Sequence, residues 1–98
     1  MKMDINKLMK EARRMQEELQ RKLEELKVEG SSGGGMVVVT MDGAKNVLDI
    51  KISEEIFKEN DVEMLQDLIL AAIQDASSKV EEESKNLIGS LGLPPGLF

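Results

Sequence analysis

A chain of 98 residues with neither cysteine nor histidine is long enough for one domain, but it lacks the side chains on which most catalytic and metal sites depend. Its net charge is −6, yet residues 1–27 carry eight Lys or Arg against six Asp or Glu, whereas residues 53–98 carry three against ten. The composition argues against an enzyme, and it makes the first segment the place to look for a surface that attracts a negatively charged partner.

The N-terminal sequence MKMDINKLMK lacks the apolar core of a signal peptide, and no stretch approaches the roughly 18 apolar residues of a membrane-spanning helix. We therefore expect a cytoplasmic protein that does not contact membranes. No motif for a cofactor or for a small-molecule substrate is present in the sequence, so we expect neither.

A long amphipathic helix is predicted over residues 4–26. Apolar residues recur there every three or four positions, at Ile5, Leu8, Ala12, Met15, Leu19 and Leu26. At 1.5 Å per residue this helix would be about 35 Å long, which is more than a small sheet can cover. We expect part of its apolar stripe to meet a second helix.

Three runs of residues predict β-strands, at Leu26–Gly30, Met36–Met41 and Val47–Ile52. The middle run, MVVVTM, is apolar on both faces, which is typical of a central strand that is covered on both sides. The pair Asp42-Gly43 tolerates positive φ and predicts a tight hairpin turn.

A second helix is predicted from Asn60, which resembles the first residue of a capping box with Glu63, to about Asn86. The glycines and prolines of residues 89–98 do not favour a helix. The fold class is therefore α+β, in the order α-β-β-β-α, with a single domain over residues 1–88 and a flexible Gly/Pro/Leu tail over residues 89–98.

The glycine run in VEGSSGGGMVVVTM invites comparison with a phosphate-binding loop. Such loops lead from a strand into a helix, whose N-terminus supplies free N–H groups. Here the run follows the first helix and leads into a strand, and no Lys-Ser/Thr pair follows Gly35. We interpret it as the tip of a hairpin.

The sequence also contains residue types that metal sites and nucleophiles use. Glu81, Glu82 and Glu83 with Asp75 could supply oxygen ligands, but consecutive helical residues point in different directions, so a solvated helix face is the better interpretation. The Ser77-Ser78 pair has no base near it in sequence. We expect no metal and no catalytic residue.

The basic residues of the first helix are the candidate surface for nucleic acid, because phosphates are bound by several cations presented together. A helix of interleaved basic and acidic residues is also typical of a solvated face, and charge alone leaves both interpretations open. The two aromatic residues are Phe57 and Phe98, too few for the stacking that single-stranded nucleic acid requires. Any nucleic acid bound should be duplex, contacted through its backbone.

Three stretches, INKLMKEARRMQEEL, VEGSSGGGMVVVTMDG and VEMLQDLILAAIQDASSKVEEE, resemble the YbaB/EbfC family of bacterial nucleoid-associated proteins in sequence and in order. The resemblance covers nearly the whole chain. It implies a homodimer in which the sheets of two copies join and the helices project as paired arms. It also implies non-enzymatic binding of double-stranded DNA with little sequence preference, a nucleoid location, and a role in nucleoid organisation or gene regulation.

Together with the charge pattern, the resemblance gives six candidate DNA-binding residues: Lys10, Arg13, Arg14, Arg21, Lys22 and Lys79. It gives five candidate dimer contacts: Leu8, Met15, Leu19, Val37 and Val39. Ser77 and Ser78 stand where relatives often carry a leucine followed by a basic residue, so we place the main DNA contacts on the first helix. The alternative function is a dimeric protein-interaction scaffold with weak or indirect DNA association, which the net charge of −6 favours.

Overall fold

The computed structural model of the protein describes residues 4–90, and residues 1–3 and 91–98 lie outside this part. The elements in chain order are α1 (Ile5–Glu25), β1 (Lys27–Ser32), β2 (Val37–Asp42), β3 (Val47–Ile52), α2 (Glu54–Glu59) and α3 (Val62–Ser90). The predicted α-β-β-β-α order is confirmed, with the short helix α2 added. Gly89 and Ser90, the first residues of the expected tail, still belong to α3, and the rest of that segment lies outside the described residues.

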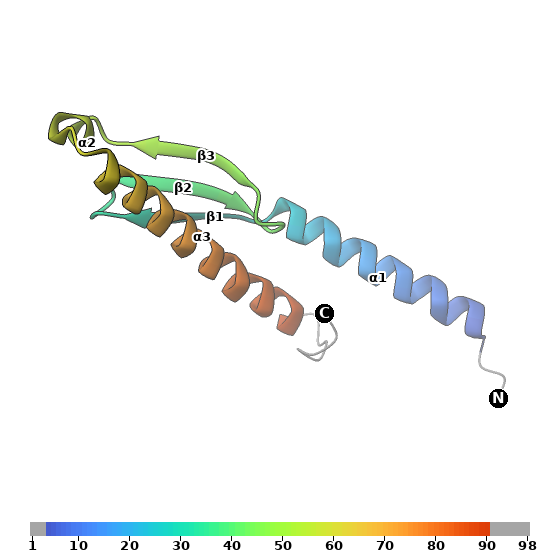
Figure 1. Cartoon of the computed structure of the whole chain (residues 1–98). Coiled ribbons are helices and arrows are strands. Elements are labelled where there is room, and N and C mark those ends of the chain that lie inside the picture. The colour runs from blue at the N-terminus through green and yellow to red at the C-terminus, as the bar shows by residue number, and fades with distance from the viewer. Residues whose placement is uncertain (1–3, 91–98) are drawn as a thin grey trace.

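The three strands form an antiparallel sheet in the order β1-β2-β3, and α3 crosses one face of it over β1 and β2 (Figure 1). The prediction that MVVVTM is the central strand is confirmed. The core forms between β2 and α3 because each presents apolar side chains at the spacing of its own element, two residues in the strand and three or four in the helix. Its buried members are Val37, Val39, Met41, Ile56, Ala72, Ala76 and Val80.

Gly30 of β1 allows α3 to approach the sheet closely. A Cβ atom at this position would collide with backbone atoms of Ala72 and Ala76, and both alanines are fully buried. Small residues on both elements are therefore what brings the helix into contact with the strand. The glycine of the VEG sequence is explained by this packing and not by a turn.

The glycine run forms the tip of the β1–β2 hairpin, as predicted. Gly33, Gly34 and Gly35 all have positive φ values, between 60° and 93°, a conformation that side-chain-bearing residues rarely adopt. The Gly35 N–H donates to the Ser32 carbonyl at 3.1 Å. The loop leads from one strand into another, so it does not present its N–H groups at a helix N-terminus as a phosphate-binding loop does.

The β2–β3 turn differs in detail from the prediction. Positive φ occurs at Lys45 (64°), not at Gly43. The carboxylate of Asp42 closes the turn by accepting from the N–H groups of Ala44 at 3.0 Å and Asn46 at 2.9 Å, as Asp side chains do in turns. Gly43 is required for another reason: a Cβ atom there would collide with the carbonyl group of Leu23.

The junction between α2 and α3 corrects the predicted capping box. Asn60 ends α2 in the left-handed conformation, with φ of 52°, and does not cap α3. Asp61 caps α3 instead, because its carboxylate accepts from the Met64 N–H at 3.0 Å. The predicted start of this helix was therefore one residue early, and α2 was missed.

Helix α1 begins at the Asp4 cap, whose carboxylate accepts from the Lys7 N–H at 3.2 Å. It ends at Leu26, which is extended and leads directly into β1. Figure 1 shows that α1 points away from the sheet, and that its C-terminal end lies beside the β2–β3 turn. The contact between Leu23 and Gly43 is made at this end. Most of α1 is therefore an arm that extends beyond the sheet.

Candidate functional site

The arm formed by α1 is exposed on all sides over most of its length. Every residue from Ile5 to Glu18 is exposed, including the large apolar side chains of Ile5, Leu8, Met9 and Met15. An apolar stripe in this position is unusual for a monomer, because burying large apolar side chains is favourable. The opposite side of the arm is available to a charged partner.

Four basic residues occupy this opposite side. Lys7, Lys10, Arg14 and Arg21 are separated by three, four and seven residues, a spacing that keeps them on one side of a helix. Arg13 and Lys22 lie to either side of that row, at the margins of the apolar stripe. The structure thus groups five of the six predicted DNA-binding residues on α1 and adds Lys7, which the sequence reasoning missed.

The charge is concentrated in the outer half of the arm. Residues 5–16 contain four Lys or Arg against one Glu, whereas residues 17–25 contain two against four. In the inner half, Arg21 lies 3.9 Å from Glu18, and both side chains are exposed, so this ion pair contributes little stability. The outer positions Lys7, Lys10, Arg13 and Arg14 are the strongest candidates for contact with phosphates.

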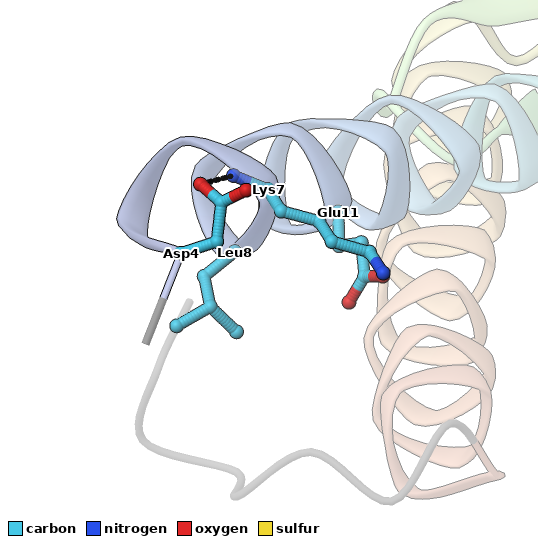
Figure 2. A pocket seen from close by; sticks show the side chains of 4 residues that line it. All are labelled: Asp4, Lys7, Leu8 and Glu11. Carbon is cyan, nitrogen blue, oxygen red and sulfur yellow. Dashed lines mark hydrogen bonds between the residues drawn. The ribbon is translucent and has the colours of Figure 1, made fainter. Parts of the chain in front are cut away.

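The hollows along α1 are shallow and are formed by α1 alone. Figure 2 shows the one near its start, where Asp4, Lys7, Leu8 and Glu11 all come from the same helix and Leu8 points away from the charged side chains. Another lies between the next turns, lined by Arg14, Glu17, Glu18 and Arg21. Small-molecule sites are concave and enclose their ligands. A surface of this shape is better suited to an extended partner that lies along the arm.

Lys79, the sixth predicted DNA-binding residue, is not part of this surface. It lies on α3, where its ammonium group donates to the Glu29 carbonyl at 2.9 Å and lies 3.2 Å from the Asp75 carboxylate. Asp75 in turn accepts from the Ser31 N–H at 2.9 Å. Lys79 and Asp75 therefore hold α3 to the outer edge of β1. The hydrogen bond from Ser31, followed by that from Lys79, lowers the pKa of Asp75 below its ordinary value of 3.8.

This contact predicts an acid-dependent loss of stability. A carboxyl group whose pKa is lowered by folding stabilises the protein above its unfolded pKa, and it loses that contribution as the pH falls through the folded value. We expect Asp75→Asn to lower the urea midpoint of unfolding at pH 7, and the difference from the wild type to shrink below about pH 4. Glu82→Gln, at an exposed position of the same helix, is the control. A difference between wild type and Asp75→Asn that persists at low pH would show that the carboxylate charge is not responsible.

The predicted dimer contacts divide into two groups. Leu8 and Met15 are exposed on α1, as an interface requires. Leu19 is buried, and Val37 and Val39 are 0% exposed beneath α3. Val37 and Val39 therefore contribute to the core of a single chain.

Neither a metal site nor a membrane segment is found between Asp4 and Ser90. No group of three or more acidic residues in this part of the chain is arranged to hold a metal ion. None of its helices is long and apolar enough to cross a membrane.

The chain is similar in sequence to a described protein family and to named relatives. The sequence model of the YbaB/EbfC DNA-binding family matches residues 1–93. A nucleoid-associated protein of Acetivibrio thermocellus is 47% identical over 102 residues, which cover 97% of this chain and 90% of that protein. A nucleoid-associated protein of Xylella fastidiosa is 48% identical over 103 residues, covering 98% and 94% respectively.

The fold is also similar to a solved structure. The crystal structure of an uncharacterised protein from Helicobacter pylori superposes with a TM-score of 0.74 at 28% sequence identity. The match covers 92% of this chain and 98% of the other.

Proposed function

This chain belongs to the YbaB/EbfC DNA-binding family, and we propose that it binds duplex DNA through backbone phosphates, with little sequence preference, as a bacterial nucleoid-associated protein. The observation that carries the proposal is the exposed cationic outer half of α1. No ion pair within residues 4–90 engages Lys7, Lys10, Arg13 or Arg14. Each is free to neutralise a phosphate and to release its counterion.

The chemistry of the arm supports backbone contact over base reading. Base edges are read by side chains that enter a groove in a fixed geometry, whereas phosphates are contacted by flexible cations. Lysine and arginine side chains that are spread over several turns of a single helix are suited to contact with phosphates. A role in nucleoid organisation or gene regulation would follow from coating DNA in this way.

We further propose that the protein acts as a homodimer whose sheets join through β3. The outward backbone groups of β1 are already occupied, because Ser31 donates to Asp75 and Glu29 accepts from Lys79. Side chains that cap an edge in this way prevent another strand from pairing with it. No such capping is present on β3 in the described part of the chain, so β3 is the open edge.

The side chains of β3 support the same assignment. Val47, Leu48 and Ile50 are 42–48% exposed, since α3 packs mainly on β1 and β2, although Ile52 at the end of β3 is packed against the core. In an antiparallel edge strand, the backbone groups of successive residues point alternately toward the neighbouring strand and outward. Just after β3, the Ser53 N–H points toward β2, because it donates to the Met36 carbonyl just before β2. The backbone of Ile50 therefore faces outward, where a second copy of β3 could pair with it across a two-fold axis. The arms would then be present twice.

A lysine at Ile50 should prevent this dimer from forming, because an edge charge opposes strand pairing. We expect Ile50→Lys to sediment as a monomer at concentrations at which the wild type is a dimer. Val62→Lys places the same charge on an exposed apolar residue of α3 and should remain dimeric. If Ile50→Lys stays dimeric, the sheets do not join through β3.

The DNA-binding proposal is tested by fluorescence anisotropy of a labelled mixed-sequence duplex, titrated with the protein at several salt concentrations. We expect the logarithm of the affinity to fall linearly with the logarithm of the salt concentration, by about 0.9 for each phosphate neutralised. Unlabelled duplexes of different sequence should compete equally. A salt slope near zero would contradict the phosphate mechanism, and unequal competition would contradict the lack of sequence preference.

A further inference from the structure

The end of the molecule opposite the arm carries a second exposed surface. Helix α2 and the first turns of α3 meet there, beyond the strands and far from the N-terminal end of α1 (Figure 1). We call residues 54–67 the distal tip. The proposed DNA-binding function does not involve this surface.

The distal tip contains an apolar groove. It is lined by Ile56, Phe57, Asn60, Asp61, Val62 and Leu65. Ile56 is buried in the core and fixes α2 in place, whereas Phe57 is 62% exposed and Val62 is 67% exposed on opposite sides of the α2–α3 junction. An exposed aromatic residue beside a groove is typical of protein contact surfaces.

The rim of the groove is strongly acidic. The distal tip carries six Asp or Glu residues against a single lysine. All six carboxylates are on exposed residues, and no ion pair within the described part of the chain engages them. A negative rim around an apolar groove repels nucleic acid and anionic membranes, and it attracts a partner that is both basic and apolar.

We propose that the distal tip is the docking site for a basic amphipathic helix of another protein. The apolar face of such a helix would lie on Phe57, Val62 and Leu65, with its Lys and Arg side chains against the acidic rim. The protein would then hold DNA at one end and a protein partner at the other. This inference does not depend on the DNA-binding proposal.

The C-terminal segment of this chain is not a suitable occupant. Residues 91–98 follow the end of α3, which has 29 residues and so ends about 43 Å from its start. Eight extended residues reach at most about 29 Å, too short for the segment to return to the groove of its own chain. The segment of a second copy contains no Lys or Arg, so it does not complement the acidic rim.

The test uses a fluorescein-labelled 18-residue helical peptide of Leu and Lys as the probe, with a second peptide in which Glu replaces each Lys. Both are titrated with the full chain at physiological ionic strength. We expect the basic peptide to bind and the acidic one not to bind. Phe57→Ser with Val62→Ser, and separately Glu59→Lys with Glu63→Lys, should each weaken binding at least tenfold. Glu82→Lys with Glu83→Lys changes the net charge equally on exposed residues outside the distal tip, and should leave binding within twofold.

Three results would overturn the proposal. Equal loss in the Glu59/Glu63 and Glu82/Glu83 variants would mean that the peptide responds to overall charge, and unchanged binding in the Phe57/Val62 variant would exclude the groove. Sedimentation gives a third: if the wild type forms assemblies larger than a dimer that the Phe57/Val62 variant does not form, the groove is occupied by another copy of this chain. Circular dichroism verifies that each variant is folded. Since these positions lie away from the arm, duplex binding should change by less than tenfold in every folded variant, through the change in net charge alone.

Discussion

A valine in place of Gly30 should destabilise the protein by about 3 kcal/mol or more, the upper end of the cost of overpacking a core. The added methyl groups would meet the backbone of Ala72 and Ala76, and backbone atoms cannot move aside as the end of a flexible side chain can. Helix α3 would have to shift away from β1, which opens the core against Val39, the cross-strand neighbour of Gly30. Urea denaturation followed by far-ultraviolet circular dichroism measures the loss.

Two other glycines provide matched controls. Gly34 and Gly89 both have open space where a side chain would be added. Gly34→Ala should cost about 1–2 kcal/mol because of its positive φ. Gly89→Ala should be neutral or slightly stabilising, since alanine favours a helix. If Gly30→Val were as stable as Gly89→Ala, the close contact between α3 and β1 would be disproved.

Reversing the charge of Lys10 and Arg14 should weaken duplex binding by at least about 100-fold at low salt. The two residues lie one helical turn apart on the exposed side of the arm, and a dimer would lose four cations and gain four carboxylates. We also expect the salt slope to fall by about 3.6, since each phosphate contact contributes about 0.9. Anisotropy titrations with one labelled duplex at several salt concentrations give both quantities.

Lys58→Glu with Lys85→Glu is the charge-matched control, because both lysines are exposed and neither lies on α1 or on β3. It should reduce the affinity by less than tenfold through the change in net charge. Similar losses in the two double variants would show that overall charge, and not the arm, governs DNA binding. The loss of duplex affinity in Arg21→Glu with Lys22→Glu should lie between the losses in the other two double variants, because these residues lie in the half of α1 that is rich in glutamate.

Much of the fold could be predicted because its elements follow simple apolar periods. The three-to-four spacing on α1 and α3 and the alternation in Val47–Ile52 are visible in the sequence, and the doubly apolar β2 could only be central. Helix α2 escaped prediction since it contributes a single buried residue, Ile56, and a six-residue helix shows no period. Asn60 was mistaken for a cap because a left-handed helix end also favours asparagine.

The candidate site was predicted less completely, and the reason is again physical. The basic residues in residues 1–27 can be counted from the sequence. Which of them lie on the same side of the arm depends on whether the segment forms one continuous helix. The hydrogen bond of Lys79 to Glu29 joins residues 50 positions apart and leaves no local signal, whereas Asp75 lies only four residues before Lys79 on the same helix. The burial of Val37 and Val39 beneath α3 likewise depends on a contact between distant parts of the chain.

The attachment of α1 gives the arm the mechanics of a lever. The helix has 21 residues and is about 32 Å long, and it is attached over its last two turns, where Leu19 is buried and Leu23 contacts Gly43. A rotation of about 10° at this attachment moves the far end by about 5 Å, more than the 3.4 Å of helix axis that each phosphate of one DNA strand occupies. If the arm binds DNA as proposed, small torsional changes near Leu26 would suffice to move the outer cations relative to the phosphates of the duplex.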